Sequence, residues 1–460
     1  MSAAPSWPAS PDRVATLAAL RERMAALGGM PGNGLVARRP AAHPARRVPE
    51  PGRLGFEAEA TAEGTAWVRR VRVDLGPFLE RAGAVPPVLP RQLVALGCRR
   101  GAPVDAAGGW PDSSVVVLDI ESMGLRGSGV LAFLVGLGVP HGTHLDVEQL
   151  LVADPGEEAA MLTALLARVG GSRLLLTYNG RTFDIPMLGA RLVINRLPRH
   201  ALDERLHSDL LPPVRRLFRD RLGGCTLRQV EVGLLGMIRE DDVPGYEAPG
   251  RYNAWLRGGA SEVLAGVVRH NELDLCATAV LGARMAAHVE GHLVMPVEAA
   301  DRYHLGVHHS TRGVREAAEL HYRACFDAGA NPRRRDAGHR LGRLLSRART
   351  AEAVEVYTRL VDADARDLRA ARALAIALQR EGRLDEALAV CSRAEASLAA
   401  MPQLVVGRLR GAPRGGWEHD WCRRRSRLES AHARAARPRT LSEERSASLR
   451  ALSPPRTSAA

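Results

Sequence analysis

Residues 113–122 have the sequence SSVVVLDIES, a run of β-branched and aliphatic residues that ends in two acids. Such a continuous apolar run is typical of a strand that is buried on both faces of a sheet. Because side chains at positions i and i+2 of a strand project to the same face, Asp119 and Glu121 are expected to point together. Adjacent buried carboxylates repel each other unless a cation lies between them, and hard oxygen ligands suit Mg²⁺ or Mn²⁺. An Asp-x-Glu pair also ends many strands in solvent, so this pair alone leaves both interpretations open.

The segments around this strand predict the rest of an α/β domain. Two more strands, a helix and a fourth strand are expected at 130–139, 144–152, 154–169 and 172–180. Further helices are expected at 183–194, 227–235, 252–257 and 261–289. Strands that alternate in this way with helices predict a mixed sheet flanked by helices.

Two later motifs contain acids that the fold could bring to the end of the first strand. Asn179 and Asp184 lie in TYNGRTFD, residues 177–184, where a strand ends and a helix begins. Sites in α/β sheets collect at such junctions, although a helix-capping Asp is the alternative. In RHNELDL, residues 269–275, His270 and Asp274 lie one turn apart on one helix face. A structural His–Asp pair is the alternative there.

In this order, the motifs resemble those of the DnaQ-like (DEDD) 3′-5′ exonucleases of the ribonuclease-H-like superfamily. The resemblance is to the YprB-type ribonuclease-H-like domain in particular, which is often joined to tetratricopeptide repeats. It covers residues 115–288 and rests on five strings, LDIESMGLRGSGVLAFLVGLG, LTYNGRTFDIPML, HSDLLPPVRRLFRDRLGGCTL, REDDVPG and VRHNELDL. The resemblance implies a ribonuclease-H-like mixed sheet and a metal-dependent 3′-5′ exonuclease that acts on nucleic-acid ends.

The resemblance also implies a set of metal ligands. Asp119, Glu121, Asp184 and Asp274 would hold two divalent cations, Mg²⁺ or Mn²⁺. In such a site one cation generates hydroxide from bound water, and the other stabilises the leaving 3′ oxygen.

Three other residues receive roles from the same resemblance. His270 is the candidate general base, and Asn179 would help to position the end of the substrate strand. Asp209, in HSDLL, is either an accessory acid or a loop and helix-cap residue. The sequence departs from the family pattern in two places, since His270 stands four residues before the last acid, where one subclass has Tyr, and Met123 replaces the commoner Thr.

Beyond residue 300 the pattern is helical and repeats. Leu344 and Ala353 recur as Leu378 and Ala387, 34 residues later, which is the period of a tetratricopeptide helix pair. We therefore expect four regions: a low-complexity lead-in and unassigned segment at 1–110, the ribonuclease-H-like domain at 111–290, TPR-like repeats at 300–400, and an Arg-rich disordered tail at 401–460. Within the first region, a helix near 14–27 and a strand at 66–73 are expected. His304, His308 and His309 have a metal-like spacing, but an interdomain surface is the preferred interpretation.

Composition limits the class of protein. The chain has 460 residues and a net charge of +13, and all of its basic residues are Arg. Residues 401–460 carry 13 Arg and 5 acids, and residues 1–50 carry 7 Arg and 3 acids, so the excess lies at the ends. We expect no membrane span, no secretory signal and, from the scattered cysteines, a cytoplasmic location. Nucleic-acid ends are the expected substrate, with a protein partner at the repeats. The alternative is a catalytically inactive nucleic-acid-binding scaffold.

Overall fold

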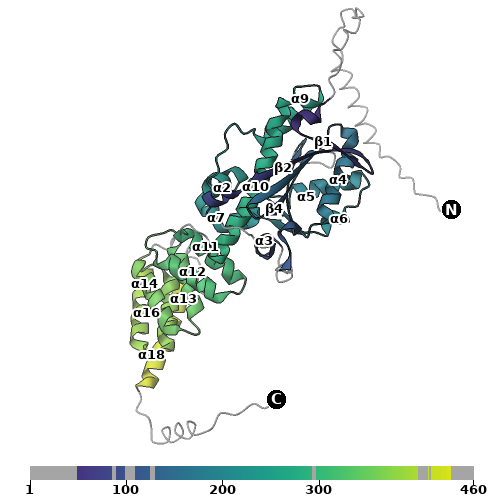
Figure 1. Ribbon diagram of the computed structural model, residues 1–460. Coiled ribbons are helices and arrows are strands. Elements are labelled where there is room, and N and C mark those ends of the chain that lie inside the picture. The colour runs from purple at the N-terminus through teal and green to yellow at the C-terminus, as the bar shows by residue number, and fades with distance from the viewer. Residues whose placement is uncertain are drawn as a thin grey trace, which may run out of the picture.

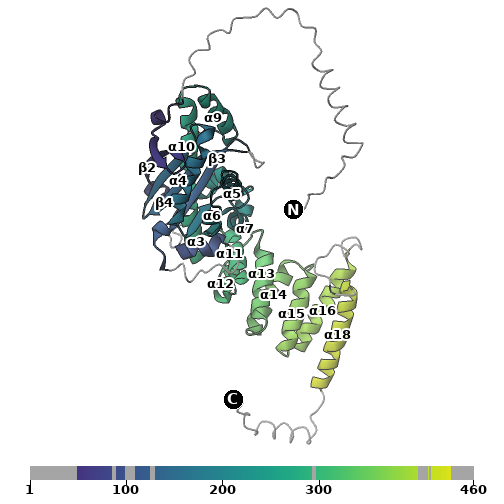
Figure 2. The ribbon, with the colours of Figure 1, turned by 90° about the vertical axis from the view of Figure 1, so that its right-hand side faces the viewer.

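The computed structural model describes residues 49–84, 90–98, 109–124, 130–292, 297–401, 413 and 416–436. A strongly twisted sheet with helices packed around it occupies the part up to residue 292, and a row of helices extends from it (Figures 1 and 2). The helix expected near 14–27 lies outside the described residues. No helix in these ranges has both the length and the apolar character needed to cross a bilayer.

Among the residues that the structure describes, the sheet has seven strands in the order β1-β2-β5-β4-β3-β6-β7. The strands are β1 (Glu57–Thr61), β2 (Gly64–Asp74), β3 (Val115–Ser122), β4 (Ala132–His141), β5 (His144–Leu151), β6 (Leu174–Thr177) and β7 (Leu206–Asp209). The first five strands in this order, β1, β2, β5, β4 and β3, pair antiparallel with their neighbours. β6 pairs parallel with β3, and β7 pairs parallel with β6. The predicted α/β fold with a mixed sheet is therefore confirmed.

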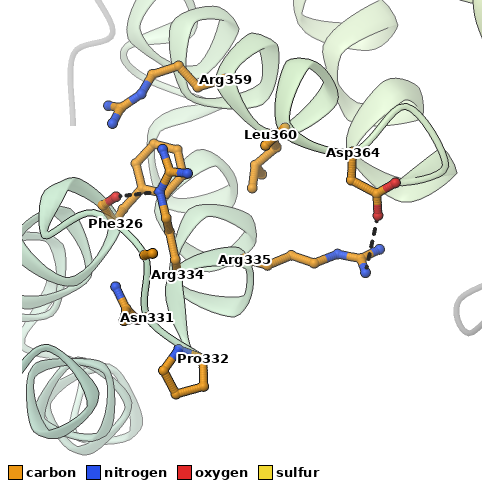
Figure 3. A pocket seen from close by; sticks show the side chains of 10 residues that line it. Phe326, Asn331, Pro332, Arg334, Arg335, Arg359, Leu360 and Asp364 are labelled. Atoms are coloured by element: carbon orange, nitrogen blue, oxygen red, sulfur yellow. Dashed lines mark hydrogen bonds and ion pairs between the residues drawn. The ribbon is translucent and has the colours of Figure 1, made fainter.

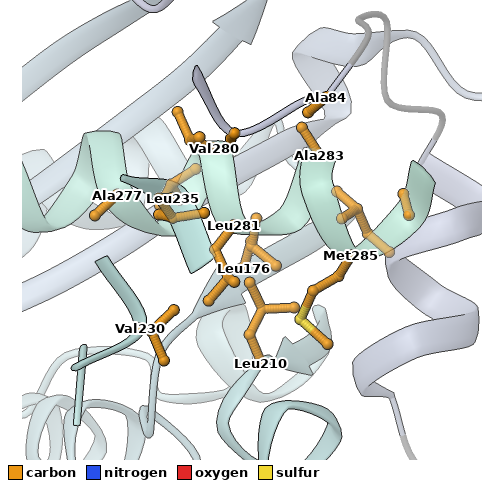
Figure 4. Close-up of a cluster of buried hydrophobic side chains, with 14 of the residues drawn as sticks. Ala84, Leu176, Leu210, Val230, Leu235, Ala277, Val280, Leu281, Ala283 and Met285 are labelled. Atoms are coloured by element: carbon orange, nitrogen blue, oxygen red, sulfur yellow. The ribbon is translucent and has the colours of Figure 1, made fainter. Parts of the chain in front are cut away.

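Helices cover both faces of this sheet. They are α2 (Gly76–Arg81), α3 (Pro90–Gly97), α4 (Glu158–Gly170), α5 (Asp184–Ile194), α6 (His200–Asp203), α7 (Leu211–Leu222), α8 (Leu227–Val230), α9 (Ala248–Leu256) and α10 (Glu262–Glu290). The longest, α10, packs against β3, β4 and β5. Figure 4 shows Val280, Leu281 and Met285 of α10 beside Leu176 and Leu210 in one core.

The two faces of β3 belong to different cores, which explains its continuous apolar run. Val115 and Val117 join the core under α10, while Val116 and Leu118 join the core under α4 and α5. By the alternation of a strand, Asp119 continues the series of Val115 and Val117 on the α10 side. The pattern that predicted a doubly buried strand thus also decides which helix its acids meet.

The segment left unassigned before residue 110 contributes to the same domain. β1 was not expected, and β2 extends the strand expected at 66–73 and pairs with β5 from Trp67 to Asp74. The second strand missed in the sequence, β7, has only four residues and lies at the edge of the sheet. Strands this short carry too few residues for a period of two to be recognisable.

In the described part of the chain after the sheet domain, six consecutive helices each pack on the next, and a further helix follows them. The six helices are α11 (Ala299–Thr311), α12 (Arg315–Asp327), α13 (Arg334–Leu345), α14 (Thr350–Ala363), α15 (Leu368–Arg380) and α16 (Leu384–Ala399). Ala353 and Ala387, which recur in the 34-residue period, are both fully buried. A Cβ at Gly342 would lie 2.5 Å from the Tyr357 ring, so a glycine is needed where these two helices meet. The helical architecture is confirmed, and its TPR-like identity stays a prediction.

The expectation of a disordered tail from residue 401 is wrong over Gly416–Ala435. These residues form α18, which packs on α16 and places Trp417, Trp421 and Leu428 in the core of the helical region. The three side chains are four and seven residues apart, close to whole turns of a helix, so they share one face. The surrounding Arg and Ser residues conceal this sparse apolar stripe in the composition.

Trp421→Ala is expected to lower the free energy of unfolding of the helical region by about 3–5 kcal/mol, because it leaves a cavity in a packed core. Urea denaturation followed by circular dichroism would measure the loss. Glu429→Ala on the exposed face of α18 is the matched control and should change the stability by less than about 0.5 kcal/mol. Equal midpoints for the two variants would show that α18 does not stabilise this region.

Candidate active site

The two acids of β3 lie at the end of the strand, on its α10 side. Asp119 is opposite Gly136 of β4, and Glu121 is opposite Leu134, just before an irregularity in the pairing at Ser122. Glu121 is only 9% exposed although the described residues offer it no ion pair. The sequence prediction that both carboxylates share one face is consistent with this placement.

Asp184 reaches the same region from the next strand along the sheet. β6 ends at Thr177, and the chain turns through Asn179, which has a left-handed φ of 68°. Asp184 then opens α5 and is 4% exposed. Asn is one of the few residues apart from glycine that adopts this conformation readily, so the Asn-Gly signal in the sequence marks the turn for a physical reason.

α10 supplies the remaining groups and fixes the orientation of Asp119. The buried amide of Asn271 donates from Nδ2 to Asp119 Oδ2 at 2.9 Å and accepts at Oδ1 from Gln149 Nε2 at 2.9 Å. Gln149 in turn accepts from Arg69 Nη1 at 2.6 Å. A Cβ on Gly136 would lie 2.3 Å from Asn271 Oδ1, so glycine in β4 makes room for this bridge.

Asp119, Glu121 and Asp184 lie near enough to other acids of the predicted set for those charges to raise their pKa values. Loss of water around Asp119 raises its pKa well above the usual range, and the charges of Asp274, Asp184 and Glu121 raise it further. Burial, followed by the charges of Asp274 and Asp184, raises the pKa of Glu121 to about 8. Burial is also the main reason that the pKa of Asp184 is raised to about 7. Acids from β3, α5 and α10 therefore converge.

This donor set fits a hard divalent cation chemically. Within the described ranges, Asp119, Glu121 and Asp184 form no ion pair, so a cation placed among them would relieve repulsion that the protein itself leaves uncompensated. Carboxylate oxygens are the ligands that Mg²⁺ and Mn²⁺ prefer. In the described part of the chain, however, no three His, Cys, Asp or Glu side chains are arranged so that they could hold a metal ion together.

Asp274 differs from the other three acids because it already has a cationic partner. Arg239 Nη2 donates to Asp274 Oδ1 at 2.5 Å. The same guanidinium donates to Glu231, from Nε at 3.0 Å and again from Nη2, and from Nη1 to Asp242 Oδ2 at 3.2 Å. One buried arginine thus links three carboxylates, only one of which the sequence motifs identified.

His270 lies beside this arginine and is held by Asp242. Its Nδ1 is 2.8 Å from Asp242 Oδ1, while its Nε2 lies 3.7 Å from Asp274 Oδ2. A carboxylate on Nδ1 can only accept a hydrogen bond, so the proton of a neutral ring is on Nδ1 and the lone pair is on Nε2. Asp242 therefore orients the imidazole with its basic nitrogen toward Asp274.

These groups line a pocket of about 470 Å³. Its wall is formed by Leu227, Arg228, Glu231, Arg239, Asp242, Val243, Pro244, Gly245, His270 and Asp274. Sequence reasoning missed Glu231, Arg239 and Asp242. The string REDDVPG contains two of them, and Glu231 opens a π-helical turn, Glu231–Leu235, a feature that often occurs at functional sites.

Asp209 and Asn179 lie next to the acids, but their contacts are with the turn itself. Asp209 Oδ1 accepts from the backbone N–H of Asn179 at 2.9 Å and of Leu211 at 3.0 Å, and Oδ2 accepts from the N–H of Arg181 at 3.1 Å. Of the two roles expected for Asp209, these bonds match the loop and helix-cap role. Its charge nevertheless raises the pKa of Asp184, so it is close to the site.

A second pocket, of about 550 Å³, lies between α12, α13 and α14 (Figure 3). The guanidinium groups of Arg334 and Arg359 lie 5.3 and 4.3 Å from the centre of the Phe326 ring. Arg359 also pairs with Asp327 at 2.7 Å, and Arg335 extends toward Asp364, 3.6 Å away. The arginines of this pocket are therefore engaged by groups of the protein itself.

The mixed sheet and its flanking helices form an α/β domain of ribonuclease-H-like architecture. In agreement, residues 116–286 match the family model of the RNase_H superfamily. Over 201 residues, 43% of the chain, the sequence is 33% identical to "Uncharacterized protein YprB" of Bacillus subtilis (strain 168). The match spans 48% of that relative, so the chain covers about half of its length.

Among solved structures, one match is to the family B DNA polymerase from the hyperthermophilic archaeon Pyrobaculum calidifontis. The match covers 45% of this chain and 28% of the polymerase, at 15% identity and a TM-score of 0.33. A TM-score this low supports no conclusion about fold or activity.

Proposed function

We propose that the protein is a metal-dependent 3′-5′ exonuclease that hydrolyses phosphodiester bonds at DNA or RNA ends. The observation that supports this proposal is that acids from three distant segments lie close together, because the charges of Asp274 and Asp184 raise the pKa values of the buried Asp119 and Glu121. Asp119, Glu121 and Asp184 have no ion pair among the described residues, and buried acids with strongly raised pKa values are typical of functional sites. The match to the RNase_H superfamily model is in agreement, because such folds are typically those of nucleases.

Asp119, Glu121, Asp184 and Asp274 would hold two divalent cations, Mg²⁺ or Mn²⁺. When bound, such cations supply an activated water and stabilise the leaving oxygen in phosphodiester hydrolysis. The protein's own contribution is to keep the ligands oriented. Asn271 performs this task for Asp119, since its hydrogen bond and the Gln149–Arg69 chain behind it hold the carboxylate in one direction.

His270 is the proposed general base. Because the Nδ1–H of His270 donates a hydrogen bond to Asp242, the lone pair on Nε2 is available to take a proton beside Asp274. An imidazole suits this step because its usual pKa lies near neutral pH. The carboxylate on the far side of the ring also stabilises the imidazolium that forms.

The Asn179–Thr182 turn would contact the end of the substrate strand. Asn179 Oδ1 accepts from Thr182 Oγ1 at 2.8 Å, and its backbone N–H is held by Asp209. Asp209 is thus a positioning residue, which acts on the substrate through the turn. The helical row α11–α16 is proposed as a TPR-like platform for a protein partner.

The activity is tested with oligonucleotides labelled at the 5′ end. With Mn²⁺ or Mg²⁺, the protein is expected to shorten single-stranded DNA or RNA stepwise from the 3′ end, and EDTA should stop the reaction. A circular single strand should stay intact, because it has no end. Cleavage of the circle would indicate an endonuclease, and no cleavage of any substrate with either metal would favour the non-catalytic alternative.

A further inference from the structure

The site holds a positive charge that the proposed reaction does not use. Arg239 is 5% exposed, and every donor nitrogen of its guanidinium faces an acid of the pocket, with Glu231, Asp242 and Asp274 as partners. Burial alone would lower the pKa of Arg239, but attraction to Asp274 and the hydrogen bond to Glu231 raise it above its ordinary value. The arginine is therefore a permanent cation inside the site.

The three partners of Arg239 are not equivalent. Glu231 and Asp242 are 1% and 6% exposed, respectively, whereas Asp274 is 18% exposed and is the partner from the candidate metal-ligand set. Glu231 and Asp242 thus anchor the arginine in the wall of the pocket, whereas Asp274 is also one of the candidate metal ligands. If Asp274 turned away, the guanidinium would still have both anchors and would not be left buried without a counter-ion.

A cation bound to Asp274 and the guanidinium on the same carboxylate would repel each other. Arg239 Nη2 is 2.5 Å from Asp274 Oδ1, and a divalent ion at that carboxylate would lie within a few Å of it. The acids without an ion pair, Asp119, Glu121 and Asp184, carry no such penalty. Asp274 is therefore the ligand at which metal binding has to compete with the protein.

We propose that Arg239 competes with the divalent cation for Asp274. Arg239 pairs with Asp274 while the metal is absent, and it keeps only Glu231 and Asp242 as partners when the metal binds. This inference rests on the proposed function, because it assumes that Asp274 is a metal ligand. Through this competition, Arg239 sets the affinity of the site for metal. The site binds the cation only when the cation concentration is sufficient to displace Arg239 from Asp274.

The test measures binding of Mn²⁺ alone, by calorimetry and by electron paramagnetic resonance, with the full chain. Arg239→Gln leaves Glu231 buried without a partner, so the informative variant is the double change Arg239→Gln with Glu231→Gln, in which two amides can bond to each other. This variant is expected to bind Mn²⁺ about tenfold more tightly than the unmodified protein. Glu231→Gln alone weakens an anchor of Arg239 and should reduce Mn²⁺ affinity about threefold.

Arg228→Gln is the matched control, because it removes one positive charge from the wall of the same pocket. Its side chain is 68% exposed and lies 3.7 Å from Asp242, so solvent screens it and Mn²⁺ affinity should change less than twofold. Unchanged or weaker Mn²⁺ binding by the double variant, with an intact melting transition, would overturn the proposal. So would equal shifts for Glu231→Gln and the double variant. If Mn²⁺ binding were instead unaffected by Asp119→Asn, the metal site itself would be wrong, and the proposed function would fail with it.

Discussion

Asp119→Asn is expected to lower the metal-dependent rate of cleavage by at least about a thousandfold while raising the melting temperature. The loss of rate follows from removing a central ligand. The gain in stability follows because the raised pKa of Asp119 means that its ionised form is disfavoured in the folded protein. The unfolded chain ionises this group at its ordinary pKa, so its contribution to stability is lost as pH rises from there toward the folded pKa. Asn removes that cost and can still pair with Asn271.

Both effects have to appear together. Asp203→Asn is the matched control, because this acid is 47% exposed on α6 and pairs with Arg199 on the surface. It should alter neither the rate of cleavage nor the melting temperature. A structural role for Asp119 predicts the opposite sign for stability, so a variant that is both inactive and less stable would contradict the proposed function. Retained cleavage by Asp119→Asn would indicate a contaminating nuclease or a different site.

The acids could be found from the sequence because each sits in a local pattern with a fixed geometry. The i, i+2 rule places Asp119 and Glu121 on one face of β3, and the four-residue period of a helix places His270 and Asp274 on one face of α10. The contact between these segments is a feature of the tertiary structure, and in the sequence only the order of the motifs indicated it.

The partners of those acids could not be found in the same way. Arg239 and Asp242 lie in an irregular loop, where no period fixes which way a side chain points. Gln149 and Arg69 look like ordinary polar positions on strands, and only the pairing of β2 with β5 and the packing of α10 bring them behind Asp119. The orientation of the site therefore depends on long-range packing that local patterns do not contain.

The helical region is joined to the sheet domain through a group of buried histidines. The rings of His309 and His321 stack with their centres 5.3 Å apart, and His308 meets His309 edge-on at 5.4 Å. His304 Nε2 lies 2.7 Å from Asp220 of α7, so α11 contacts the sheet domain, in line with the interdomain interpretation of this spacing. Neither ring nitrogen of His288 has a hydrogen-bond partner among the described residues.

Burial keeps the rings of His288, His308 and His321 neutral in the folded protein. It lowers the pKa of His288 and His308 to about 3 and that of His321 to about 4. Positive neighbours lower these pKa values further, and they are Arg284, Arg221 and Arg302 around His288, Arg312 and Arg216 around His308, and Arg302 around His321. An added proton at this junction would therefore enter a dry and already positive environment.

Acidification from pH 7 to pH 5 is expected to destabilise the junction strongly. Above pH 6.5 these histidines are neutral in both states and their protonation has no effect. Below pH 6.5 these histidines bind protons in the unfolded chain but not in the folded protein. The free energy of unfolding therefore falls by about 1.4 kcal/mol per pH unit for each ring. At pH 5 this amounts to about 2 kcal/mol per ring, or at most about 6 kcal/mol for His288, His308 and His321 together.

His288→Leu provides the direct test of this linkage, since it removes a titrating ring without breaking a hydrogen bond. Urea denaturation at pH 7 and pH 5 should show about 2 kcal/mol less acid destabilisation in this variant than in the unmodified protein. His200→Leu, at an exposed position on α6, should leave the difference between the two pH values unchanged. If His288→Leu kept the full acid sensitivity, the folded protein would have to protonate His288 as readily as the unfolded chain does, and the ring could not lie in a dry junction.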